Sequence, residues 1–217
     1  MKIKKVNIWM TSLLLMVLLM SACGKLDNKE SEKYETTITN SSEITGLTEK
    51  QEDAIENGFQ VDEYTVYLTE ENKQSQQDIE NFIESNFYEK NVLQVKDRID
   101  KSLKVNILTY AMNYSPEEER YTLGVFFINT SQETMEELAM TVRPIFKNVP
   151  QTGEFGTIHL KGENFVALPT NGIIVRSFSA DAPIEFLDQL KQNKGEDITF
   201  EIKDLEINGE KVNNSNE

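Results

Sequence analysis

Three kinds of side chain could do chemistry in this sequence: the single cysteine, the single histidine and the 37 aspartates and glutamates. The cysteine, Cys23, follows the small residues Ser21 and Ala22, at the end of an uncharged apolar run from Ile8 to Met20. Three lysines, at positions 2, 4 and 5, precede that run. A basic segment, a short apolar segment and small residues in this order are typical of a secretory signal. The cysteine therefore lies where an exported chain is processed.

The last four residues of this pattern, Met20-Ser21-Ala22-Cys23, resemble the lipobox of bacterial lipoproteins. The resemblance implies that the chain is cut before Cys23, which then carries a thioether-linked diacylglycerol and an N-acyl group. Several acyl chains anchor a protein stably, whereas a single chain binds a membrane only marginally. We therefore expect a lipid-anchored protein on the extracytoplasmic face of the cell membrane, with the bilayer as a partner through Cys23. The Lys-, Asn-, Glu- and Ile-rich composition resembles that of Gram-positive bacteria.

Two other interpretations of the N-terminus fit less well. The uncharged run is much shorter than the roughly 20 residues that a membrane-spanning helix needs. An ordinary signal peptide requires small side chains at both the first and the third position before the cut. Cleavage after Ala22 would place the bulky Met20 at the third position. The lipoprotein pattern accepts a large apolar residue there, although Leu is its usual choice.

The histidine, His159, lies in an alternating segment between Ile158 and Leu160, with the polar residues Thr157 and Lys161 on its own side. A Ser-His-Asp triad would need this residue as its base. The Gly-x-Ser-x-Gly motif of such hydrolases is absent from the chain, and we expect a surface histidine. One histidine and one lipidated cysteine also exclude an ordinary zinc or copper site. We expect no metal, no cofactor and no catalytic residue.

The densest group of carboxylates is Glu117-Glu118-Glu119. Carboxylate oxygens are ligands for Ca²⁺, but the Asp-x-Asx-x-Asx-Gly loop is missing and three adjacent glutamates cannot all point at one ion. We expect a solvated hairpin tip here. Paired carboxylates elsewhere in the chain leave a hydrolase open as an alternative.

The formal net charge is −15, and it becomes more negative when the lysine-bearing signal is removed. Binding a polyanion requires a cationic surface, so this charge argues against nucleic acid as a partner. The same charge should keep the body of the protein off an anionic bilayer.

Changes in composition divide the chain into four parts. Residues 1–22 form the signal. Residues 23–57 are polar and acidic, with no apolar period, and are predicted to be a disordered tether. Residues 58–212 are predicted to form a single folded domain, and residues 213–217 a frayed tail.

Within 58–212, periodicity predicts one long helix and several strands. The helix spans 72–90, with a stripe of Ile79, Phe82, Ile83 and Phe87. Its N-cap is Ser75, in a capping box with Asp78, or Thr69. Alternation predicts strands around 64–68, 103–107, 121–127, 138–143, 158–160, 173–178 and 198–207, and a short helix after Pro183. In the last strand the apolar parity slips near Lys203-Asp204, which indicates a bulge.

This order of elements predicts a mainly β protein of the α+β type: an antiparallel β-sandwich with an N-terminal amphipathic helix. The segment from Val125 to Ser131 resembles the strand–Asn-x-Ser/Thr–strand turn of immunoglobulin-like domains in exported bacterial proteins. That resemblance implies an immunoglobulin-like sandwich, although the usual cysteine pair and core tryptophan are absent.

Three functions remain open at this point. The favoured hypothesis is a non-enzymatic accessory or protein-binding module of the cell envelope, which should show an exposed apolar patch or an unpaired sheet edge. An envelope hydrolase should bring two carboxylates together in a concave pocket and raise the pKa of at least one. A small-molecule or ion receptor should enclose a cavity of several hundred Å³.

Overall fold

The computed structural model describes residues 47–84, 87–149, 155–181 and 184–216, which belong to one compact unit. The predicted signal, Cys23 and the predicted tether up to residue 46 lie outside the described residues.

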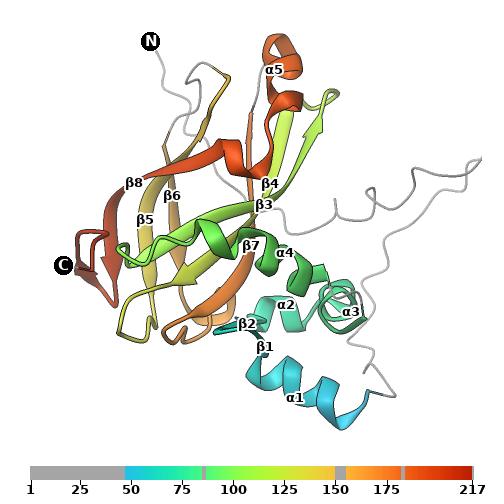
Figure 1. The fold of residues 1–217 in the computed structure, drawn as a ribbon, viewed down its shortest axis with the longest axis vertical. Helices are drawn as coiled ribbons and strands as arrows, with labels where there is room; N and C mark the ends of the chain where they lie inside the picture. Colours follow the sequence, from blue (N-terminus) through green and yellow to red (C-terminus); the bar gives the residue numbers. More distant parts are fainter. Residues whose placement is uncertain (1–46, 85–86, 150–154, 182–183, 217) are drawn as a thin grey trace, which may run out of the picture. The chain divides into compact units, whose positions relative to one another are not determined.

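Two sheets account for most of the regular structure, so the protein is a mixed α+β protein with mostly sheet content (Figure 1). The five-stranded sheet has the order β1 (Phe59–Val61), β2 (Tyr64–Tyr67), β7 (Gly172–Asp181), β4 (Arg120–Asn129) and β3 (Val105–Ser115). The four-stranded sheet has the order β6 (Gly156–Leu160), β5 (Leu138–Phe146), β8 (Ile198–Ile207) and β9 (Glu210–Lys211). The prediction of a purely antiparallel fold is wrong at one pair, because β2 runs parallel to β7. A parallel pair needs a long connection, and the chain between β2 and β7 contains most of the domain.

The helices are α1 (Glu49–Asn57), α2 (Glu70–Lys73), α3 (Gln76–Glu84), α4 (Phe87–Val95) and α5 (Leu187–Gln192). Four single 3₁₀ turns are η2 (Lys96–Arg98), η3 (Gly162–Asn164), η4 (Ile184–Phe186) and η5 (Gly195–Asp197).

The predicted single helix over 72–90 is wrong, because two N-caps follow each other within a few residues. Thr69 begins α2, where its side chain and that of Asn72 form a reciprocal capping box. Ser75 then begins a new helix: its Oγ accepts a hydrogen bond from the backbone N–H of Asp78 at 3.3 Å. A serine that bonds to nearby backbone competes with helix continuation, and this favours a break between α2 and α3.

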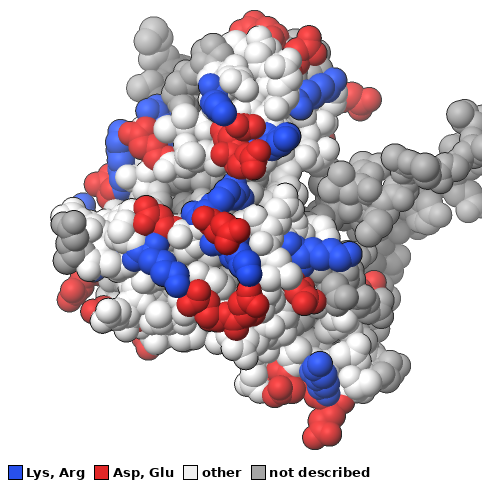
Figure 2. Space-filling view, in the orientation of Figure 1, with Lys and Arg blue, Asp and Glu red and all other residues white. Residues whose placement is uncertain are grey.

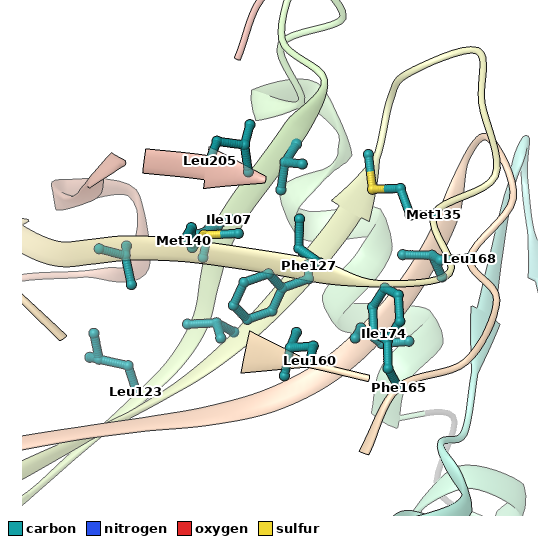
Figure 3. Packing of buried hydrophobic residues seen from close by; sticks show 14 of the residues in the cluster. Ile107, Leu123, Phe127, Met135, Met140, Leu160, Phe165, Leu168, Ile174 and Leu205 are labelled. Atoms are coloured by element: carbon teal, nitrogen blue, oxygen red, sulfur yellow. The ribbon is translucent and has the colours of Figure 1, made fainter. Parts of the chain in front are cut away.

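The first hydrophobic core, which we call the inter-sheet core, lies between the two sheets (Figure 3). It takes alternate residues from both, such as Leu123 and Phe127 of β4 on one side and Leu138 and Met140 of β5 on the other. All four of these side chains are buried. This alternation is the pattern expected of strands that contribute one face each to a shared core.

A second core, which we call the helix-side core, covers the opposite face of the five-stranded sheet. Phe126 and Ile128 of β4 point into it and meet Phe82 of α3 with Tyr88 and Val92 of α4. The interior strand β4, which pairs with β7 and β3, is therefore buried on both faces. The described residues form three layers, helices, sheet and sheet, whereas a two-layer sandwich with one attached helix was expected.

Two local predictions are confirmed. Residues 116–119 connect β3 to β4 as the tip of an antiparallel hairpin. The pairing of β5 with β8 shifts register beside Asp204, whose φ is 48°. This bulge is the reason why the apolar residues of β8 change parity after Ile202.

The predicted domain boundaries are wrong at both ends. The predicted tether contains α1, which begins with a capping box between Thr48 and Gln51, and Ala54 and Ile55 of this helix pack against the helix-side core. The predicted frayed tail is bound to β3: Asn214 Oδ1 accepts from the backbone N–H of Val105 at 2.8 Å, and Asn214 Nδ2 donates to its carbonyl at 3.0 Å. Both segments were predicted to be unstructured because they are rich in polar residues. In the structure those polar side chains bond to backbone: Thr48 caps α1, and Asn214 holds Val105.

Candidate functional site

His159 lies on the exposed face of β6, as its polar neighbours predict. Its Nε2 lies within hydrogen-bonding distance of Glu137 Oε1, and Lys161 Nζ is 3.8 Å from the same oxygen. The hydrogen bond with His159 and the charge of Lys161 hold the pKa of Glu137 below its usual value. The contacts that the structure describes for His159 include no serine or threonine hydroxyl, so they do not build a triad.

The Glu117-Glu118-Glu119 cluster lies at the exposed tip of the β3–β4 hairpin. Glu119 has a φ of 48°, a left-handed conformation that turns the chain into β4. Among the described residues, no group of three or more His, Cys, Asp or Glu side chains is placed to hold a metal ion. The cluster forms part of a solvated turn.

Sequence reasoning missed a buried polar cluster that joins α2 and α3 to β7. We define this cluster as Glu71, Asn72, Ser75, Asp78 and Arg176. Asp78 is 3% exposed and accepts a hydrogen bond from Asn72 Nδ2 at 3.0 Å. Burial raises the pKa of Asp78, and the nearby charge of Glu71 raises it further, whereas hydrogen bonds from Asn72 and Ser75 and the charge of Arg176 lower it.

Arg176 is the cationic member of the cluster, and it donates from Nη1 to Glu71 Oε2 at 3.1 Å. Its Nε and Nη2 are buried without a hydrogen-bond partner in the described part of the chain. Burial lowers the pKa of Arg176, although Glu71 and Asp78 oppose this shift. The ion pair links α2 to β7, and the cluster therefore acts first as a structural link between layers.

A groove lies beside the helix layer, between α1, β1, α3 and α4, with a volume of about 260 Å³. Its apolar walls come from Ala54, Phe59, Phe82 and Ile83. Glu89 is the one carboxylate among the described lining residues, and Asp78 does not line the groove. The groove therefore does not bring together the two carboxylates that the hydrolase alternative requires. Its volume is slightly below that of pockets for drug-sized ligands, so the groove suits only a smaller occupant.

The outer face of the four-stranded sheet is polar and carries a partly buried aromatic ring between two cations. Phe155 lies directly before β6, with Arg143 Cζ 4.4 Å and Lys203 Nζ 4.0 Å from its ring centroid. Both cations also contact Glu201, Arg143 at 2.6 Å and Lys203 at 3.1 Å. The strand β6 forms an edge of this sheet. In the described part of the chain β5 is the one strand paired with β6, so alternate N–H and C=O groups of β6 point away from β5 and are available to a further strand.

No family model, no curated protein and no solved structure matched this chain. In the described part of the chain, none of the helices has both the length and the apolar character needed to cross a membrane.

Proposed function

We propose that this chain is a lipoprotein anchored through Cys23 to the extracytoplasmic face of the cell membrane, where it acts as a non-enzymatic accessory or protein-binding module of the envelope. The observation that carries the proposal is the basic, apolar and small-residue order that ends in Ser21-Ala22-Cys23. The acidic chain supports it, since a net charge of −15 disfavours nucleic acid as a partner. Figure 2 shows acidic and basic side chains interspersed over one face of the molecule, with no extended patch of one sign.

We further propose that the two facing sheets form an immunoglobulin-like sandwich. The turn after β4 supports this, because Asn129 organises it from a fully buried position. Asn129 Oδ1 accepts from the backbone N–H and the Oγ of Ser131, at 2.9 and 2.7 Å. Its Nδ2 donates to the carbonyls of Glu133 and Leu168, at 2.8 and 2.7 Å. The helix layer and the parallel β2–β7 pair would be additions to that fold.

Replacement of Cys23 tests the anchor. In cells fed labelled palmitate, the wild-type chain should become labelled and collect in the membrane fraction. Cys23→Ala removes the sulfur that forms the thioether, so we expect the label to disappear. Ser21→Ala is the matched control, because a second small residue keeps the signal pattern, and it should keep the label. A Cys23→Ala chain that is labelled as strongly as the wild type would disprove the anchor.

The outer sheet face and the β6 edge are our proposed docking surface for an envelope protein. A photo-crosslinking residue at Thr157, which is exposed on β6, should give a discrete crosslinked product in intact cells. The same residue at the exposed Lys90 of α4 serves as the control and should give none. Equal crosslinking from both positions, or none from Thr157, would contradict docking at β6.

A further inference from the structure

The groove between α1, β1, α3 and α4 has an aromatic floor. The rings of Phe59 and Phe82 meet edge to face, with centroids 4.7 Å apart and planes at 68°. Tyr88 continues the series, with its ring centroid 6.2 Å from that of Phe82 and the planes at 56°. Inclined rings present both faces and edges to an occupant, which favours an aromatic or aliphatic group. The volume of about 260 Å³ limits that occupant to a small molecule or a single side chain with its backbone.

The rim of the groove carries hydrogen-bond donors on the α1 side. Lys50 lines the groove and is exposed on α1, and Gln51 lies beside it. Gln51 Oε1 is already engaged by the backbone N–H and the Oγ1 of Thr48, both at 2.9 Å. The capping box therefore fixes the Gln51 amide and leaves its Nε2 as the donor group.

The α4 side of the rim carries the opposite charge, from Glu89. Among the described residues, neither Lys50 nor Glu89 has an ion-pair partner. The groove thus combines a cation with a neutral donor on one helix, a carboxylate on another and an apolar floor between them. A ligand that uses all three must carry a carboxylate, an ammonium group and an apolar body.

We propose that this groove binds a small zwitterion with an apolar body, namely a free apolar amino acid. Its carboxylate lies toward Lys50 and Gln51, its ammonium group lies toward Glu89, and its side chain lies against Phe59 and Phe82. This site is independent of the lipid anchor and of the outer sheet face, because it lies on the helix layer.

The position of the only tryptophan offers a direct test. Trp9 lies in the N-terminal segment, so the full-length chain carrying Trp9→Phe contains no tryptophan. Binding of L-tryptophan, and of the larger dipeptide alanyl-tryptophan for comparison, is then measured from the fluorescence of the ligand, with the protein in detergent. We expect saturable binding of L-tryptophan and weaker binding of the dipeptide, because the groove volume of about 260 Å³ admits one side chain with its backbone. Indole, N-acetyltryptophan and tryptophan amide lack one or both charges and should bind more weakly.

Variants assign the binding to the groove. Lys50→Gln and Glu89→Gln should each raise the dissociation constant about 1.5-fold to fivefold, the range expected for exposed charge pairs. Lys90→Gln and Glu52→Gln replace exposed charges on the same two helices that do not line the groove, and they should leave it unchanged. Ala54→Phe should fill the groove and abolish binding, while circular dichroism verifies that this variant is folded.

Several results would overturn the proposal. One is the absence of saturable binding of L-tryptophan, and another is binding of indole as tight as that of L-tryptophan. Equal effects of the rim variants and their controls would also contradict it, as would full binding by a folded Ala54→Phe chain. None of these results would bear on the lipid label at Cys23.

Discussion

Asp78 illustrates how a single buried residue makes this protein sensitive to pH. It lies on α3 and is 3% exposed, and burial raises its pKa above the usual value of a carboxyl group. The folded state therefore holds a proton on Asp78 at pH values where the unfolded chain has released it. In that window the free energy of unfolding must fall as the pH rises.

Asp78→Asn should remove this dependence on pH. The amide keeps the shape of the protonated acid and carries no charge, so the variant should gain stability relative to the wild type as the pH rises above about 4, the usual pKa of an aspartate. Urea denaturation at several pH values measures the difference. The matched control is Asp188→Asn, which makes the same chemical change at an exposed position on α5. A constant difference for Asp78→Asn would show that the residue keeps its ordinary pKa in the fold.

The strand pair β3–β4 shows what one bulge does for a whole element. The register shifts between Thr109 and Ala111, so Tyr110 is the additional residue of β3. The bulge turns its ring across β4, where it stacks on Phe126 with centroids 4.5 Å apart. The ring also lies against Gly124: a Cβ at this glycine would be 2.7 Å from Tyr110 Cζ. Because glycine has no side chain, position 124 leaves room for the Tyr110 ring in the helix-side core.

Gly124→Ala should lower the free energy of unfolding by about 1–3 kcal/mol, the usual cost of overpacking a core. Chemical denaturation measures this change. In a Tyr110→Ala background the ring is gone, so the same substitution should cost much less. Gly156→Ala is the control, because its added Cβ would lie at ordinary contact distances, the nearest being 3.8 Å from the carbonyl of Val142. Equal costs at both glycines would indicate a backbone effect rather than contact with Tyr110.

Among the elements, strands could be placed from the sequence because apolar and polar residues alternate where one face of a strand is buried. The bulge near Asp204 was found in the same way, from a change in parity. The bulge at Tyr110 left no such signal, because both faces of the five-stranded sheet are buried and polar residues do not mark either side. The break between α2 and α3 was missed for another reason: both candidate N-caps, Thr69 and Ser75, are in use.

At the scale of the whole molecule, the sequence could predict a sheet-rich fold but not its layers. The parallel pairing of β2 with β7 and the helices over the second face depend on contacts between distant segments, which periodicity does not report. The candidate sites likewise include one that the sequence could predict and two that it could not. His159 was placed correctly on a polar face, whereas the groove and the Asp78 cluster combine residues from separate elements that have no motif in common.

The clamp of the C-terminal tail on β3 bears on the time at which this chain can finish folding. Asn214 holds the backbone of Val105, and Asn216 Nδ2 donates to the carbonyls of Lys101 and Thr130 at 2.9 and 3.1 Å. Both asparagines follow the strands of the two sheets in sequence, so a ribosome adds them after those strands. The start of β3 therefore lacks these hydrogen bonds until the strands of both sheets have been made. Fixing the start of β3 is thus a late step in the folding of this domain.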